Sequence, residues 1–353
     1  MRKNFQYRIP LLKPSLVAVV LLIIFLSGCK RNAEILGPSQ VSADENFVLL
    51  TPFSCNKQTV RFDTEPLKFY AKFNQPVTWR ITAQSTSSEA VKRITSTSEV
   101  VDSNTVKWDG SSDNMYFFRS GEDVLIRFEI LGIKDTYVDT IRIATEKDYS
   151  SNSCLVLYDW DQNLKVKDPG GASAAGISRF NMGVKPLQGM FSLGIYEPAS
   201  TKTKEILSLG FNEYNSLKYF PITENDPSKV FFNVYIHSDK KYSGVNLLIQ
   251  FNEDDDGDGN YEMGGLGFSG NNGPYLSEDG YTTEIPLDWV GWKLVSVPLS
   301  TAQRSPLTLW GGGGNKKWDL DKIMGFNIKV SSSQSVKLHF DFVTLTFGKP
   351  FIK

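Results

Sequence analysis

The stretch "SVKLHFDFVTLTFG", residues 335–348, indicates the fold class most clearly. Apolar residues recur along it at alternate positions and many are aromatic or β-branched, which is typical of a β-strand. Strict alternation places Val336, Leu338, Phe340 and Phe342 on one face. It places Val343, Leu345 and Phe347 on the other face, together with Asp341. If both faces are covered, the Asp341 carboxylate needs a partner to offset its loss of hydration.

Several segments before this one have the same character. They are short, apolar or alternating, and are joined by long loops rich in Gly and Asp: "CLVLYDWDQ" (154–162), "GMFSLGIYE" (189–197), "KVFFNVYIHS" (229–238), "GVNLLIQFN" (244–252), "GWKLVSVPLS" (291–300) and "IMGFNIKVSS" (323–332). Strands of this length and spacing predict a jelly-roll β-sandwich over residues 152–350.

A separate all-β domain is expected before it, over residues 46–146. Its strand-like segments are "VTWRITAQ" (77–84), "EVVDSNTVKWDG" (99–110), "MYFFRSG" (115–121), "DVLIRFEILG" (123–132) and "YVDTIRIAT" (137–145). About 100 residues with this pattern fit an immunoglobulin-like sandwich. Trp79 and Trp108 are expected to pack in it, and the domain is expected to act as a spacer.

The N-terminus has the features of an export signal. A basic region precedes "SLVAVVLLIIFLSGC" (15–29), whose apolar part is shorter than the roughly 20 residues that span a bilayer. "LSGC" resembles a bacterial lipobox, which implies a signal peptide at 1–28 and a lipid on Cys29. The alternatives are an ordinary secreted protein cleaved nearby and an uncleaved anchor. Residues 29–45 are polar with Gly and Pro and read as a flexible tether. Lys30, in place of Asp, favours the outer membrane, with the protein expected at the cell surface.

Charge and cysteines narrow the function. The formal net charge is −1 and no basic run follows the signal, so nucleic acid is not an expected partner. After Cys29 only Cys55 and Cys154 remain. In an oxidising envelope they are expected either to form a disulfide or to stay as two buried thiols.

The segment "FNEDDDGDGNYEMGG", residues 251–265, holds an unusual density of acids. Its D-x-D-x-D-G-x-x-E spacing matches the first half of a calcium loop, because a chain wrapping a hard cation returns an oxygen at every second residue. The predicted ligands are Asp254, Asp256, Asp258, Asn260 and Glu262. Position 12 is Gly265, so the segment is not an EF-hand. The alternative is a solvated hairpin tip of ordinary turn residues.

The order of "LYDWDQ", "GWKLVSVPLS", "LDKIMGFNIKV" and "HFDFVTLTFG" resembles the galactose-binding-like jelly roll. Many carbohydrate-binding modules have this fold, including those on surface glycan-binding lipoproteins of Bacteroidetes-like bacteria. The resemblance implies a polysaccharide or oligosaccharide ligand. It also implies a structural calcium between the first and last strands, with Asp341 opposite Asp159 or Asp161.

Sugar rings bind to exposed aromatic faces, while their hydroxyl groups need hydrogen bonds. Four aromatic residues in long loops are the candidates for glycan binding: Trp310, Trp318, Tyr275 and Tyr281. Packing in the core is the alternative for each of them.

The sequence therefore predicts a non-catalytic, membrane-anchored glycan-binding lipoprotein with a calcium cofactor. The alternative is an interaction subunit of an outer-membrane protein complex. An enzyme is not expected, because neither a G-x-S-x-G nor an H-E-x-x-H motif occurs and both His237 and His339 fall within predicted strands.

Overall fold

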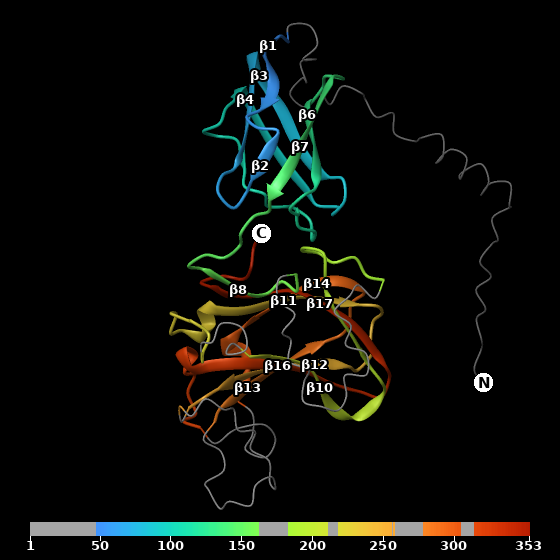
Figure 1. Cartoon of the computed structure of the whole chain (residues 1–353), viewed down its shortest axis with the longest axis vertical. Coiled ribbons are helices and arrows are strands. Elements are labelled where there is room, and N and C mark those ends of the chain that lie inside the picture. The colour runs from blue at the N-terminus through green and yellow to red at the C-terminus, as the bar shows by residue number, and fades with distance from the viewer. Residues whose placement is uncertain (1–46, 162–182, 211–217, 256, 258–277, 305–313) are drawn as a thin grey trace, which may run out of the picture. The chain divides into compact units, whose positions relative to one another are not determined.

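The computed structural model describes residues 47–161, 183–210, 218–255, 257, 278–304 and 314–353 (Figure 1). Residues 1–46 form one unit of the chain and residues 47–353 the other. The signal peptide, Cys29 and the tether therefore lie outside the described residues. Strands and three short 3-10 helices make up the regular structure of the described part. Within that part, no helix is long and apolar enough to span a bilayer.

The first β-domain is built around one long strand, β3 (Leu67–Ser85). This strand pairs with four others, of which β1 and β5 bond to its first half. The other strands are β1 (Leu49–Cys55), β2 (Thr59–Arg61), β4 (Val91–Val101), β5 (Lys107–Trp108), β6 (Asp123–Ile130) and β7 (Thr136–Thr145). Trp79 and Trp108 are 1% exposed in its core, as expected. An immunoglobulin-like relationship of this domain stays a prediction.

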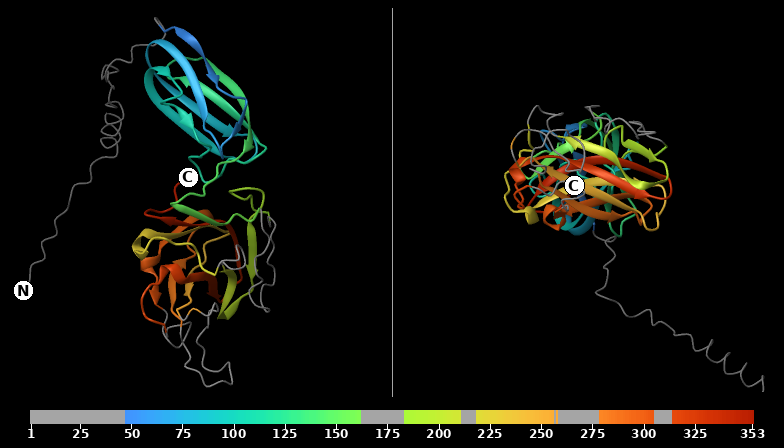
Figure 2. Two further views of the ribbon diagram at one scale, coloured as in Figure 1. Left: turned by 60° about the vertical axis from the view of Figure 1, so that its left-hand side comes forward. Right: turned by 90° about the horizontal axis from the view of Figure 1, so that it is seen from below.

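The second β-domain is a sandwich of two five-stranded sheets, which confirms the all-β prediction (Figures 1 and 2). One sheet has the strand order β14-β11-β17-β8, and β9 also pairs with β17. Its strands are β8 (Cys154–Tyr158), β9 (Leu193–Glu197), β11 (Val230–Ser238), β14 (Gly291–Pro298) and β17 (Val336–Phe347).

The other sheet, called the polar sheet below, has the order β10-β16-β12-β13-β15. Its strands are β10 (Ser200–Gly210), β12 (Asn246–Glu253), β13 (Gly280–Pro286), β15 (Gln303–Arg304) and β16 (Ile323–Ser332). The 3-10 helices η1 (Pro227–Lys229), η2 (Leu299–Thr301) and η3 (Leu320–Lys322) each precede or follow a strand.

Aromatic residues join the two sheets of the sandwich. The ring of Phe232, on β11, lies 4.4 Å from that of Phe326 on β16 and 5.7 Å from that of Phe251 on β12. All three residues are at most 1% exposed. Because burying such a ring stabilises a fold by about 1.5–3 kcal/mol, this contact fixes the inward faces of both sheets. The residues between them along each strand must then face outward.

The strict alternation predicted for β17 is wrong beyond Asp341. The register against β11 slips between Asn233 and Tyr235, and Phe342 has a φ of +42°. A bulge of this kind places two consecutive residues opposite one and exchanges the faces that follow. Leu338 and Phe340 consequently share the core with Val343 and Leu345, which were expected on the opposite face. Phe342 leaves this core and lies 5.3 Å from Phe351.

The predicted disulfide is not formed. Cys55 and Cys154 are both free thiols, which agrees with the alternative of two separate cysteines. Burial, with Asp139 nearby, raises the pKa of Cys55 to about 12, and burial raises that of Cys154 to about 11. Both groups are therefore unreactive thiols rather than thiolates at neutral pH.

Candidate functional site

The outward face of the polar sheet carries a row of hydrogen-bonding side chains that crosses all five strands. Leu247, Ile249 and Phe251 of β12 point into the core, so Gln250 points outward between them. Strand pairing continues this position to both edges, through Ser208 on β10, Asn327 on β16, Thr282 on β13 and Gln303 on β15. The row thus holds two amides at its centre, flanked by hydroxyl groups and ended by a third amide.

The centre of this row is shielded from water although it faces away from the core. Gln250 is 1% exposed and Asn327 is 7% exposed. Ser208 Oγ donates to Asn327 Oδ1 over 3.0 Å. An amide side chain offers two donors and two acceptor sites, which is the chemistry that suits a hydroxyl-rich ligand.

A buried lysine supports the row from the next outward position of β16. Lys329 is 2% exposed and donates from Nζ to Oε1 of Gln250. Burial lowers the pKa of Lys329 to about 8, and Glu205, its partner on β10, opposes this shift. Lysine side chains are rarely buried unless they are paired. Here the hydrogen bond from Lys329 Nζ orients the Gln250 amide.

On the other side of the row, Asn252 stands alone between two glycines. It pairs with Gly325 on β16 and with Gly280 on β13, so neither neighbouring strand places a side chain beside it. Asn252 is 5% exposed, and its Oδ1 has no hydrogen-bond partner among the described residues. A buried carbonyl oxygen without a partner is destabilising by about 1–3 kcal/mol, so a ligand hydroxyl group would be a favourable partner for it.

This outward face was not predicted from the sequence. It is called the polar face below and comprises Ser208, Gln250, Asn252, Thr282, Gln303, Asn327 and Lys329. A signal was present, because "IQFN" (249–252) and "FNIKV" (326–330) both alternate apolar residues with amide or lysine residues. What the sequence did not provide is the pairing of these segments, which lie about 75 residues apart and meet only through the register of β12 with β16.

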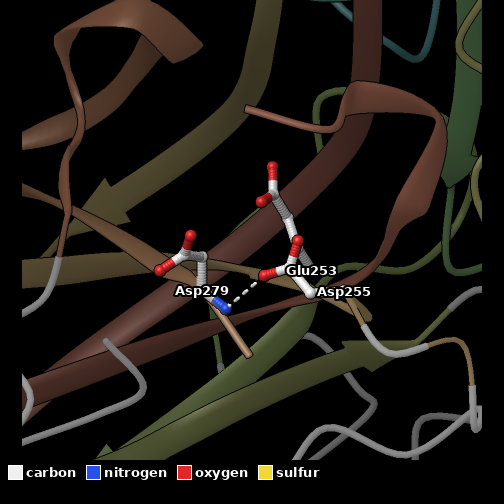
Figure 3. A group of neighbouring side chains, drawn as sticks. All are labelled: Glu253, Asp255 and Asp279. Atoms are coloured by element: carbon white, nitrogen blue, oxygen red, sulfur yellow. Dashed lines mark hydrogen bonds between the residues drawn. The ribbon is translucent and has the colours of Figure 1, made fainter. Parts of the chain in front are cut away.

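A second polar feature lies at the end of β12, where three carboxylates converge. Oxygen atoms of Glu253, Asp255 and Asp279 all lie within 4.8 Å of one another (Figure 3). Asp255 Oδ2 accepts a 2.9 Å hydrogen bond from the main-chain N–H of Asp279. Glu253 Oε1 accepts one of 2.9 Å from Asp319 N–H. Desolvation, together with the charges of Asp255, Asp319 and Asp279, raises the pKa of Glu253 to about 9.

This group differs from the calcium ligands expected in the acidic segment. Asp254, the first expected ligand, is fully buried and turned to other partners: Lys218 Nζ at 2.8 Å and Tyr219 Oη at 2.7 Å. Asp256, Asp258, Asn260 and Glu262 lie outside the described residues. The residues that converge are the neighbours of Asp254, because β12 continues as a strand through Glu253 and so sets which side each acid faces.

Asp341, expected to hold calcium with Asp159, is fully buried. Its Oδ2 accepts hydrogen bonds from Leu187 N–H at 2.7 Å and Gln188 N–H at 3.2 Å, while its Oδ1 has no hydrogen-bond partner among the described residues. Asp159 Oδ1 accepts a hydrogen bond from Asp161 N–H. Asp161 Oδ1 in turn accepts hydrogen bonds from the N–H groups of Met190 and Phe191. Calcium takes six to eight oxygens. In the described part of the chain, no group of three metal-binding side chains includes Asp341.

The four aromatic candidates separate into two pairs. Trp310 and Tyr275 lie outside the described residues. Tyr281 is 4% exposed and Trp318 packs against the same core, with their rings stacked at a centroid distance of 3.6 Å. The structure therefore places Tyr281 and Trp318 against each other, beside the three carboxylates, and does not offer the ring of Tyr281 to a ligand.

Comparison with known proteins gives structural similarities only. No protein-family model matches the chain, and no curated protein matches it. One similar structure is a family 11 carbohydrate-binding module from Clostridium thermocellum in complex with a β-1,3-1,4-mixed-linked tetrasaccharide. The identity is 14% and the TM-score 0.35, covering 56% of this chain and 98% of the module.

Another similar structure is a family 30 carbohydrate-binding module of a cellulosomal cellulase of the same organism. Its identity is 12% and its TM-score 0.34, covering 55% of this chain and 97% of that module. Similarities at this level assign neither a ligand nor a site, so the function has to be argued from the residues of the chain itself.

Proposed function

We propose that this protein is a non-catalytic glycan-binding protein and that the polar face of its second sandwich binds the sugar. The observation that carries the proposal is the row Ser208–Asn327–Gln250–Thr282–Gln303, which crosses all five strands of one sheet. Sugars present closely spaced hydroxyl groups that both donate and accept. Amides and hydroxyl groups at successive strands, about 4.8 Å apart, match such a ligand.

The chemistry of the row favours binding over catalysis. Amide and hydroxyl side chains do not ionise near neutral pH, whereas cleavage of a glycosidic bond needs a carboxylic acid paired with a carboxylate. The buried Lys329 holds the Gln250 amide in place on one side of the row, and the unpartnered Oδ1 of Asn252 adds a fixed acceptor on the other side. Pre-formed groups of this kind lower the cost of ordering on binding.

We further propose that the protein is anchored in the outer membrane through a lipid on Cys29, at the cell surface. The basic region, the apolar segment and "LSGC" support this proposal. Residues 29–45 and the first β-domain would then serve as tether and spacer for the sandwich that carries the polar face. A lipid anchor with one such module concentrates a polysaccharide at the membrane.

The proposal is tested with soluble protein comprising residues 30–353 on a panel of polysaccharides by affinity electrophoresis. We expect retardation by one glycan class and no release of reducing sugar. No retardation by any glycan, with the protein shown to be folded by its tryptophan fluorescence, would overturn the proposal. Release of reducing ends would contradict its non-catalytic part.

A further inference from the structure

We propose a divalent-cation site for Ca²⁺, formed by Glu253, Asp255 and Asp279 at the end of the sandwich. Each residue contributes one carboxylate oxygen, and these oxygens lie within 4.8 Å of one another (Figure 3). Two of the three residues, Glu253 and Asp279, are fully buried. An all-carboxylate set is the donor chemistry that calcium prefers, with waters or carbonyl oxygens completing its six to eight ligands.

An unpartnered buried oxygen points to a ligand here. Glu253 is 0% exposed, and while its Oε1 accepts from Asp319 N–H, its Oε2 has no hydrogen-bond partner among the described residues. An oxygen that is buried and unpaired is destabilising, so its presence indicates a partner outside the described residues. A cation shared with Asp255 and Asp279 would supply the partner of Glu253 Oε2.

The hydroxyl group of Tyr281 gives a second, independent indication. It also lacks a hydrogen-bond partner in the described part of the chain, on a residue that is 4% exposed. Tyr281 follows Asp279 by two residues and pairs in register with Arg304, whose Nε donates to Asp279 Oδ1. Two buried polar groups without hydrogen-bond partners among the described residues, Glu253 Oε2 and the Tyr281 hydroxyl, therefore belong to residues at this end of the sheet.

The basic groups around the site do not replace a cation at Glu253. Arg304 Nε donates to Asp279 Oδ1, and Lys322 Nζ donates to the main-chain oxygen of Asp255 over 2.8 Å. Among the described ion pairs, none includes Glu253. Asp279 thus has a cationic partner in Arg304, whereas Glu253 has none among the described residues.

A cation at this position would join three segments that are distant in sequence. Glu253 ends β12 and Asp255 follows it, Asp279 precedes β13, and Asn315 and Asp319 precede η3. Asn315 Nδ2 donates to Asp255 Oδ1 and to Asp319 Oδ2, over 2.8 and 2.7 Å. Asn252, the isolated amide of the polar face, is the residue next to Glu253. The ion would therefore fix the end of the sheet that carries the polar face.

The test uses residues 30–353, freed of metal with a chelator that is then removed, and no glycan, so that it is independent of the proposed function. Ca²⁺ is titrated by calorimetry. Tb³⁺ luminescence, excited through the stacked Tyr281 and Trp318, reports the place of the ion. We expect saturable Ca²⁺ binding, a rise in melting temperature with Ca²⁺, and sensitised Tb³⁺ emission that Ca²⁺ displaces.

Two variants assign the site. Glu253→Gln keeps the acceptor for Asp319 N–H and removes one ligand charge, so it should weaken Ca²⁺ binding at least tenfold. Glu284→Gln removes an equal charge from β13 and should change the Ca²⁺ affinity less than twofold. Among the described side chains, Glu284 accepts a hydrogen bond only from Asn246. Asp255→Asn, at a half-buried position, repeats the test if the first variant does not fold. Absent Ca²⁺ binding up to about 10 mM, roughly tenfold above the dissociation constants of the weakest protein sites, would overturn the site, and so would equal effects of the two glutamate variants.

Discussion

Replacing Asp341 separates its charge from its role as a hydrogen-bond acceptor. The carboxylate is fully buried in the bulge of β17 and accepts the main-chain N–H groups of Leu187 and Gln188. Asp341→Ala leaves both donors without their acceptor, at about 1–3 kcal/mol each, or about 2–6 kcal/mol together. Asp341→Asn retains a carbonyl oxygen for both donors. Since both variants remove the charge, their difference in free energy of unfolding measures the two hydrogen bonds.

The charge itself should contribute in the opposite direction. Burial raises the pKa of Asp341 well above its usual value, so the folded state binds a proton more tightly than the unfolded state does. Stability from this group is complete below the unfolded pKa and is lost as pH rises through the folded pKa. At pH 7, Asp341→Asn is therefore expected to be at least as stable as the parent protein.

The assay is urea unfolding of residues 30–353, followed by tryptophan fluorescence, for the parent and both variants at pH 7 with and without a chelator. We expect Asp341→Asn to exceed Asp341→Ala by about 2–6 kcal/mol, unchanged by the chelator. Equal stability of the two variants would refute the role of the two N–H groups. A loss in Asp341→Asn that disappears with the chelator would show that Asp341 binds a metal instead.

Two further predictions concern the same sandwich. His339 is 1% exposed beside His237 at a ring distance of 5.8 Å, and burial lowers its pKa to about 4. The unfolded chain binds the proton first, so the free energy of unfolding should fall by about 3 kcal/mol between about pH 6.5 and 4; His339→Gln should flatten that fall, and an unchanged profile would contradict the assignment. At Gly189, with φ +55°, an added Cβ would lie 1.3 Å from Asp161 Oδ2. Gly189→Ala should cost at least about 2 kcal/mol, against about 1–2 kcal/mol for Gly244→Ala, where φ is +70° and the space is open; equal costs would exclude the Asp161 contact.

Local pattern predicted most strands of the second β-domain but not β10 or β13, and "MYFFRSG" (115–121), expected to be strand-like, forms no strand. "GWKLVSVPLS" is β14 followed by η2, and "KVFFNVYIHS" contains β11, because apolar alternation is a property of neighbours in sequence. It did not predict the bulge at Phe342, whose positive φ depends on the contacts of the folded chain. One added residue in the register moved Val343 and Leu345 into the core, which no count of alternating positions could show.

The sites were predicted less well, since both depend on strands that are distant in sequence. The D-x-D-x-D spacing selected Asp254, yet Lys218 and Tyr219 pair with that carboxylate and the adjacent acids converge with Asp279. The polar face likewise requires the register of β12 with β16 and β13. Aromatic content, used to predict glycan-binding residues, identified Tyr281 and Trp318, which instead stack on each other.

The most direct test of glycan binding compares two asparagines on the same face of β12. Asn252 lies between glycines and its Oδ1 has no partner among the described residues. Asn246 lies about 20 Å from Asn252 along the strand and donates a hydrogen bond to Glu284. The binding constant of residues 30–353 for the retarding glycan is measured by calorimetry for Asn252→Ala and Asn246→Ala. We predict a loss of about threefold to tenfold for Asn252→Ala, the equivalent of one hydrogen bond, and no change for Asn246→Ala. Unchanged affinity in Asn252→Ala, or equal losses in both variants, would contradict binding at the polar face.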